Sequence, residues 1–258
     1  MTKPYEEKLV SIITPTYNSR TYIEQTINSV INKTYKEWEL IIVDDCSTDN
    51  IEEIIKTNLE KDPRIKFIKL EVNSGAAKAR NKALSVANGR FIAYLDSDDI
   101  WYNNKLEVQV KCMIENKWGF SCTAYEVIGD DGKSKNKKIY MKEEVDYRGF
   151  LINNLIQTVG VMIDLKLVNK NYIFMPDMRR RQDAATWLQI LNSGQKCYGI
   201  NEILAAYRRT EGSLSSNKFK AVSGVWYLYR HIEKLSLIQA VYCFTRYAVL
   251  AVWKRIYI

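Results

Sequence analysis

The stretch FIAYLDSDD, residues 91–99, joins a short apolar run directly to three carboxylates. A buried strand that ends at Leu95 would bring Asp96 and Asp98 to the carboxyl edge of a sheet, where open α/β sheets bind their ligands. Acidic side chains this close repel one another unless a cation or a hydrogen-bond network offsets their charge. Their oxygens suit Mg2+ or Mn2+ held together with the phosphates of a substrate. The alternative is a solvated acidic turn, because aspartate is common in turns.

The residues before this acidic run alternate between expected strands and expected helices. Apolar, β-branched runs predict strands at 9–14, 38–43, 64–70 and 91–95. Helical spacing of apolar residues predicts helices at 20–33, from about 50 to 60, and at 76–87. We expect Pro15 to end the first strand and Ser19 to cap the first helix. Strict alternation of this kind implies a parallel sheet with right-handed crossovers.

A second strand also ends in carboxylates, because Asp44 and Asp45 follow the strand expected at 38–43. Two acidic strand ends at one edge of a parallel sheet make a binding site there more probable than a single one would. The chain has no GxGxxG after the first strand and no GxxxxGK[ST] motif. These absences disfavour a dinucleotide-binding Rossmann fold and a P-loop NTPase. A metal at the acidic edge would have to hold the nucleotide instead.

The second half of the chain does not repeat this alternation. It predicts helices at 105–115 and 146–154, and strands or short apolar segments at 119–127, 159–168, 197–200 and 203–207. The basic run at 133–138 is expected to be a solvated hairpin loop. The sequence therefore predicts a mixed second half.

Asp183 is a candidate general base. It follows three arginines at 179–181 and precedes Trp187 on the face of an expected helix. The helix dipole and the adjacent arginines favour its ionised form, and an ionised carboxylate is a competent base if it faces a substrate hydroxyl. The alternative is a simple helix-capping aspartate.

Composition limits the classes of function. The 258 residues are 47% hydrophobic and 26% charged, which is enough for a real core. A net charge of +8 and a pI of about 9.1 favour an anionic partner: a nucleic acid, an anionic lipid or a phosphorylated substrate. Five scattered cysteines without CxxC spacing argue against disulfides and a zinc site. With no apolar segment at its N-terminus, the protein is expected to be cytoplasmic.

From Lys218 onward the chain predicts helices rich in aromatic residues, with many interspersed basic side chains and one acidic residue, Glu233. The apolar segment 235–253 is near the lower length limit for a membrane span and contains Arg246. We therefore expect it to lie along an anionic membrane surface. Packing on the main domain and self-association into oligomers are the alternatives. The expected domains are residues 1–215 and 216–258.

Four motifs resemble, in order and spacing, those of family 2 glycosyltransferases with the GT-A fold. They are VSIITPTYN at 10–18, IIVDDCSTD at 41–49, ARN at 79–81 and LDSDD at 95–99. The resemblance covers residues 8 to 100 and extends more weakly to about 215. It implies an α/β fold with a mostly parallel central sheet, helices on both faces and a C-terminal helical appendage. The chain is most similar to bacterial enzymes that build O-antigen, capsule or teichuronic acid repeat units on a lipid carrier.

The resemblance implies roles for the residues that bind the donor. Pro15 and Tyr17 match positions that line the nucleobase pocket, with Tyr17 suited to stack on uracil. Asp45 matches an aspartate that accepts a hydrogen bond from the base. Arg80 matches a position near the sugar nucleotide, where it could meet the diphosphate.

The same resemblance extends to the metal and to the base. Asp96, Ser97 and Asp98 match the D-x-D motif, in which Asp96 and Asp98 hold the metal and Asp98 is the more direct ligand. Asp183 matches the base of the inverting members. The family usually has Glu-Asp at this point, whereas this chain has Gln182. Three residues, Arg208, Ser213 and Ser215, resemble a loop that folds over the nucleotide.

The implied function is inverting transfer of a sugar from a UDP-sugar, with Mn2+ or Mg2+, to a hydroxyl of a saccharide linked to polyprenyl diphosphate. The enzyme would act at the inner face of the cell membrane. Within the enzyme class, the alternative is direct transfer to polyprenyl phosphate. A non-catalytic sugar-nucleotide-binding protein is another alternative, because the glutamate before Asp183 is missing. A nucleic-acid-binding module is disfavoured, because the acidic strand ends would repel phosphate without a metal.

Overall fold

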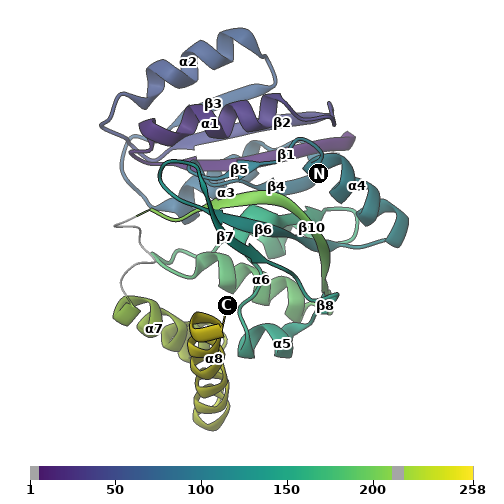
Figure 1. Ribbon diagram of the computed structural model, residues 1–258, viewed down its shortest axis with the longest axis vertical. Helices are drawn as coiled ribbons and strands as arrows, with labels where there is room; N and C mark the ends of the chain where they lie inside the picture. The colour runs from purple at the N-terminus through teal and green to yellow at the C-terminus, as the bar shows by residue number, and fades with distance from the viewer. Residues whose placement is uncertain (1–5, 211–217, 258) are drawn as a thin grey trace.

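A single mixed sheet of ten strands with helices on both faces forms the body of the molecule (Figure 1). The computed structural model describes residues 6–210 and 218–257. The strands are β1 Glu6–Thr16, β2 Trp38–Asp44, β3 Ile65–Lys69, β4 Gly89–Tyr94, β5 Ile100–Trp101, β6 Phe120–Ile128, β7 Ser134–Ile139, β8 Glu144–Val145, β9 Val161–Asp164 and β10 Cys197–Arg208. The helices are α1 Arg20–Ile31, α2 Ile51–Lys61, α3 Ala76–Val86, α4 Lys105–Asn116, α5 Tyr147–Ile152, α6 Gln182–Asn192, α7 Lys218–Tyr227 and α8 Leu237–Tyr257. Short helical turns are η1 Thr158–Gly160, η2 Lys170–Ile173 and η3 Leu228–Ile232.

The first four long strands form the predicted parallel sheet. The order across the sheet is β3-β2-β1-β4-β9-β6-β10-β5. The pairs β3/β2, β2/β1 and β1/β4 are parallel, so the carboxyl ends of these strands meet at one edge. Strand β9 then enters antiparallel between β4 and β6, and β6 pairs in parallel with β10. The sheet is therefore parallel in its first half and mixed in its second.

Two apolar cores cover the two faces of the sheet. On one face Ile12 and Ile42 pack with Ile27 of α1. On the other face Ile13 and Ile41 pack in the cluster that contains α3. Side chains of consecutive strand residues point to opposite faces, and both faces are covered, which explains why β2 and residues 10–16 of β1 are buried throughout. The alternation of the sequence thus becomes a sheet with a helix layer on each side.

Pro15 does not end the first strand, contrary to the expectation from the sequence. Strand β1 continues to Thr16, and Pro15 lies opposite Val43 of β2. The carbonyl of Ile13 accepts the backbone N–H of Leu95, so Ile13 and Pro15 both direct their backbone groups toward β4. Because β4 ends at Tyr94, the missing N–H of Pro15 leaves no partner unsatisfied.

Three further strands differ from the expectations or were absent from them. The basic run at 133–138 is largely strand β7, which pairs antiparallel with β6. The segments 197–200 and 203–207 join into the single strand β10, which passes an irregularity in its pairing with β6 between Ile200 and Ala205. The two-residue strand β5 was not foreseen, because Ile100 and Trp101 are too short a run to show periodicity. Strands β5 and β10 depend on partners distant in the chain, whereas β7 pairs with the adjacent strand β6.

The C-terminal helices pack against α5 and α6, and α8 extends away from the sheet (Figure 1). Trp226 and Phe244 stack edge to face with their centroids 5.6 Å apart, and the hydroxyl of Tyr147 donates to Glu233 over 2.6 Å. In the described parts of the chain, no helix has the length and apolar character needed to cross a membrane. The expected boundary at 215/216 lies outside the described residues.

Glu39 joins four strand ends at the amino edge of the sheet. Its carboxylate accepts hydrogen bonds from Ser11 Oγ (2.5 Å), Lys66 Nζ (2.5 Å) and the Asn88 backbone N–H (2.7 Å). Burial alone would raise the pKa of Glu39, but the hydrogen bonds from Lys66, Ser11 and Asn88 outweigh burial and lower this pKa below its ordinary value.

We expect Glu39→Gln to reduce the free energy of unfolding by about 2 kcal/mol at pH 7, because it removes a buried, charge-assisted acceptor. A lowered pKa stabilises the fold above the unfolded pKa and loses that effect as the pH falls through the folded pKa. Urea unfolding from pH 7 to pH 3 should therefore show that the variant loses less stability than the native protein below about pH 4.5. The control is Glu37→Gln, at an exposed position two residues away. Equal acid sensitivity of both variants would contradict the role given to Glu39.

Candidate active site

The carboxyl ends of β1, β2 and β4 bring the predicted nucleotide residues to one edge of the sheet. Tyr17 directly follows β1, and half of its surface is exposed. Asp45 follows β2 and is almost fully buried. Its carboxylate oxygens each accept a backbone N–H at 2.7 Å, one from Ser74 and one from Gly75. An exposed aromatic ring therefore lies at the end of the strand next to a rigidly held carboxylate.

Gly75 has a reason to be glycine in this arrangement. Its φ of +90° lies in the region that side chains rarely adopt, and it is the residue before α3. Its N–H donates to Asp45 while α3 begins at the next residue. The loop from β3 is thereby tied to the end of β2, and this fixes where α3 starts.

Arg80 of α3 is the central cation of the edge. It is 5% exposed, its Nη2 donates to Asp96, and its Nη1 lies 3.9 Å from the sulfur of Met175. Burial alone would lower the pKa of Arg80, but the charges of Asp96 and Asp183 raise it. Two carboxylates from distant parts of the chain are thus close enough to act on one guanidinium.

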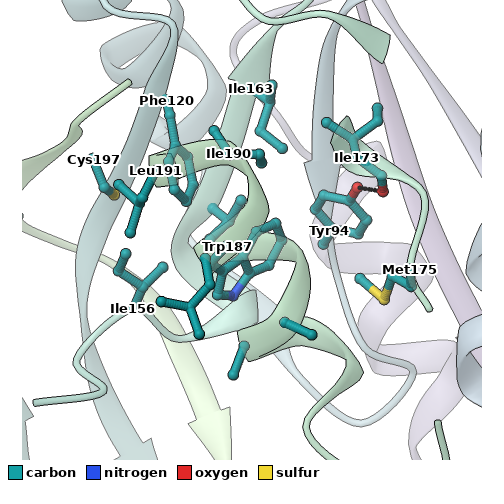
Figure 2. Packing of buried hydrophobic residues seen from close by; sticks show 14 of the residues in the cluster. Tyr94, Phe120, Ile156, Ile163, Ile173, Met175, Trp187, Ile190, Leu191 and Cys197 are labelled. Carbon is teal, nitrogen blue, oxygen red and sulfur yellow. Dashed lines mark hydrogen bonds between the residues drawn. The ribbon is translucent and has the colours of Figure 1, made fainter. Parts of the chain in front are cut away.

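The position of Asp183 follows from how α6 packs. Asp183 lies in the first turn of α6, and Trp187 lies one turn later on the same face. Figure 2 shows the Trp187 ring between Tyr94 at the end of β4 and Phe120 of β6, with centroid distances of 5.3 and 5.5 Å. This packing holds the amino end of α6 near the carboxyl end of β4. Thr158 adds a 3.4 Å hydrogen bond to the Asp183 carboxylate.

Asn81 fixes the segment that leads toward α6. Its side-chain amide donates to the carbonyl of Met175 and accepts the N–H of the same residue, both over 2.8 Å. The Tyr94 hydroxyl reaches the carbonyl of Ile173 at 3.5 Å (Figure 2). The ARN motif therefore serves two purposes: Arg80 contacts the acidic loop, and Asn81 holds the chain that approaches the base.

Three polar residues on and just after α1 support the acidic loop and the strand β5 that follows it, and the sequence analysis missed them. The Thr26 hydroxyl lies 3.0 Å from the carbonyl oxygen of Ser97 and 2.9 Å from that of Asp99. Ser29 Oγ accepts the N–H of Trp101 at 3.3 Å, and Lys33 Nζ donates to the Trp101 carbonyl at 2.9 Å. The sequence feature that could have indicated them is a series of polar side chains, spaced three and four residues apart, on the otherwise apolar face of α1.

Arg208, at the end of β10, holds the same loop from another element. Its backbone N–H donates to Asp99 Oδ1 at 2.8 Å and its Nε to the Asp98 carbonyl at 2.7 Å. Its other guanidinium nitrogens donate to the carbonyls of Gly129 and Asp130 and to Gln25. Arg208 is 2% exposed and its polar atoms are bonded to protein groups, so in this structure it supports the acidic loop. The matching residues Ser213 and Ser215 lie outside the described residues.

The acidic loop carries excess negative charge that a cation would offset. Burial and the neighbouring Asp96 raise the pKa of Asp98 to about 6. Burial and the charge of Asp98 raise the pKa of Asp99 well above its ordinary value. Asp99 is buried and accepts the Arg208 N–H, whereas the Asp96 side chain is about one-third exposed. Asp96 and Asp98 are therefore the carboxylates suited to a metal.

The donor atoms fit a hard divalent cation. The described residues contain no group of three or more His, Cys, Asp or Glu side chains placed to hold a metal by themselves. Mg2+ in phosphate-binding sites is commonly held by one or two carboxylates together with the phosphates and water. Asp96 and Asp98 match that arrangement, because substrate oxygens would complete the coordination.

A parallel sheet edge with a D-x-D loop, a buried arginine and a separate aspartate at a helix start defines a nucleotide-sugar transferase of the GT-A class. The sequence matches "Glycosyl transferase family 2" over residues 11–171. The chain belongs to this family, and it is a glycosyltransferase. The family and fold predicted from the four motifs are thereby confirmed.

Two relatives are similar along most of their length. The "Putative teichuronic acid biosynthesis glycosyltransferase TuaG" of Bacillus subtilis is 48% identical over 248 residues, which cover 96% of this chain and 98% of the relative. The "UDP-Glc:alpha-D-GlcNAc-diphosphoundecaprenol beta-1,3-glucosyltransferase WfgD" of Escherichia coli is 39% identical over 222 residues, 86% of this chain and 85% of the relative.

Solved structures share the fold at low identity. S. aureus TarS 1-349 in complex with UDP-GlcNAc aligns with a TM-score of 0.71 at 22% identity, over 93% of this chain and 71% of that one. The mannosyltransferase PcManGT from Pyrobaculum calidifontis, in complex with GDP-Man and Mn2+, aligns with a TM-score of 0.69 at 16% identity, over 96% of this chain and 75% of that one.

We expect Thr26→Val to lower the free energy of unfolding by about 1–3 kcal/mol, because two buried loop carbonyls lose their shared donor. The change keeps the volume of the side chain, so packing is not the cause. Thr57→Val is the matched control, since the Thr57 hydroxyl bonds only within exposed α2. Urea unfolding of both variants measures the difference. If Thr26→Val unfolded like Thr57→Val, the support given by α1 to the loop would be unimportant.

Proposed function

We propose that the protein transfers a sugar from a UDP-sugar to a hydroxyl of a saccharide carried on polyprenyl diphosphate, with inversion at the anomeric carbon. The product would extend a bacterial surface polysaccharide repeat unit. One observation carries the proposal: Trp187 of α6 packs on Tyr94 at the end of β4, which brings the helix start with Asp183 to the strand end that leads into Asp96 of the D-x-D loop. A candidate metal ligand and a candidate base therefore share one site.

The donor would bind along the strand ends. Tyr17 offers an exposed ring for stacking on the base, with Pro15 preceding it in β1. Asp45 would accept from the N–H of the base through the free lone pairs of its fixed carboxylate. Ser97 holds its loop in place through the carbonyl bound by Thr26. The two strand ends thus recognise the base, and the acidic loop meets the diphosphate.

Asp96 and Asp98 would hold Mn2+ or Mg2+, which when bound neutralises charge on the diphosphate of the leaving nucleotide. Arg80 adds fixed positive charge beside the same loop. Asp183 accepts the proton of the acceptor hydroxyl as that oxygen bonds to the anomeric carbon and the bond to UDP breaks. A single displacement requires base and leaving group on opposite faces of that carbon, which is why separate carboxylates serve the two tasks.

The names of the relatives and the surface of α8 support the acceptor class. WfgD is named for transfer to a GlcNAc-diphosphoundecaprenol, and TuaG for teichuronic acid synthesis. On α8 the side chains of Leu237, Ile238 and Tyr242 are 60%, 83% and 59% exposed. Basic residues on this helix and before it, Lys234 and Arg246, complement anionic lipid headgroups. We therefore place the protein at the inner membrane surface as a peripheral protein, and a second copy on this face is the competing arrangement.

We expect Asp183→Asn to lower the rate of sugar transfer by about 10²- to 10⁴-fold, the usual contribution of a general base. The affinity for UDP with Mn2+ should stay within twofold, because Asp183 contacts the acceptor side. UDP release in the presence of a lipid extract, and calorimetric titration of UDP, measure the two effects. The control is Asp177→Asn, at a well-exposed position. Normal turnover by Asp183→Asn would show that the base is another group.

We expect Asp98→Asn to remove activity and Mn2+-dependent UDP binding together, since it deletes a ligand charge while keeping the size of the side chain. A chelator should produce the same loss in the native protein. Asp131→Asn, on the exposed β6–β7 turn, is the control. Undiminished transfer in excess chelator would refute the metal role.

A further inference from the structure

Three consecutive arginines, Arg179 to Arg181, directly precede the helix that carries Asp183. Among the described residues, neither Arg179 nor Arg181 forms an ion pair with a carboxylate. The nearest acidic residue before them in the chain, Asp177, is paired with Lys78 at 3.2 Å. The positive charge at this point therefore exceeds what the neighbouring acids offset.

Arg181 is held in an unusual conformation. Its φ of 63° lies in the left-handed region, which costs a residue with a side chain about 1–2 kcal/mol. Its Nη2 donates to the Tyr247 hydroxyl at 3.0 Å, and its guanidinium lies 5.8 Å from the centroid of that ring. Strained residues of this kind persist where the surroundings fix them, and they concentrate at functional sites.

The C-terminal helices meet α6 at these arginines. Gly224 of α7 approaches so closely that a methyl group in its place would lie 3.4 Å from Arg181 Cγ. Tyr247 contributes from α8, whose exposed apolar side chains include Val241 and Val249. Asp183 lies two residues after Arg181 in the chain, and Arg181 contacts α8 through Tyr247. The base, the arginines and the apolar helix therefore follow one another in this order.

A polyprenyl-diphosphate saccharide presents its groups in the matching order. Its sugar hydroxyl, its diphosphate and its hydrocarbon chain follow one another, and when the acceptor carries a single sugar, one ring lies between the hydroxyl and the diphosphate. The donor diphosphate is already assigned to the acidic loop and Arg80, so a second diphosphate needs its own cations. Arginine forks match the oxygens of phosphate groups in two parallel hydrogen bonds.

We propose that Arg179 and Arg181 form the subsite for the diphosphate of the acceptor lipid. This inference rests on the proposed function and adds where the acceptor is held. It implies that the attacked hydroxyl belongs to the sugar linked directly to the diphosphate, because the arginines adjoin the base.

The test is equilibrium binding of farnesyl diphosphate, with UDP and Mn2+ present in excess to fill the donor site. We expect the native protein to bind it, and the double variant Arg179→Gln/Arg181→Gln to bind about tenfold more weakly or worse. Lys111→Gln/Lys138→Gln, which removes the same charge from α4 and β7, should bind as the native protein does. Farnesol, which lacks the diphosphate, should bind all three proteins equally.

Two further variants separate binding from folding. Arg179→Gln alone changes an exposed side chain and should weaken binding without changing the thermal midpoint. Arg179→Lys/Arg181→Lys keeps the charges and should restore part of the affinity. Native-like binding by both glutamine variants, or no binding of farnesyl diphosphate by the native protein, would overturn the proposal. Sugar transfer does not enter this measurement, so failure of transfer would refute the proposed function and leave the diphosphate result standing.

Discussion

The ion pair between Arg80 and Asp96 is the contact on which the site depends. A buried guanidinium without a carboxylate would be very costly, and a loop of three aspartates without a cation would repel itself. Each group therefore offsets the charge of the other. Because Asp183 also acts on Arg80, the same cation links the regular first half of the sheet to α6. Removing Asp96 would leave the buried guanidinium without its hydrogen-bonded carboxylate, whatever substrate is bound.

A shell of buried polar groups holds the acidic loop around this ion pair. Thr26 of α1 and Arg208 of β10 bind carbonyls of the loop, and Lys33, just after α1, binds the carbonyl of Trp101 in β5. Burial lowers the pKa of Lys33 to about 7, and likewise that of Lys105, whose Nζ lies 4.3 Å from the Trp101 ring centroid. Such groups are expensive to bury and contribute little net stability. Their benefit is a loop whose carboxylates are positioned before the substrate arrives.

The sequence allowed prediction of features that local patterns determine. Alternating strands and helices in residues 9–95 predicted the parallel half of the sheet. Carboxylates after two of the strands predicted which edge of the sheet carries the site. The antiparallel insertion of β9 could not be predicted, because it pairs with β4 across about 70 residues of chain. The hairpin partner β7 is local, but its lysine-rich sequence lacks the apolar alternation that indicates a strand. Arg208 was matched to a loop that folds over the nucleotide, whereas its partners in the structure are backbone carbonyls and side-chain oxygens 78 to 183 residues away, visible only in the fold.

The residue before the base, Gln182, affects how much negative charge lies on the acceptor side of the site. Gln182 stands where similar enzymes usually carry glutamate, and its buried Oε1 has no hydrogen-bond partner among the described residues. A glutamate there would place a second carboxylate beside Arg181 and compete with any phosphate for that guanidinium. The neutral amide leaves Asp183 as the one acidic group in the first turn of α6. The first turn of α6 thus carries a single negative charge, that of the base, and the arginines before it keep their positive charge for an anionic acceptor.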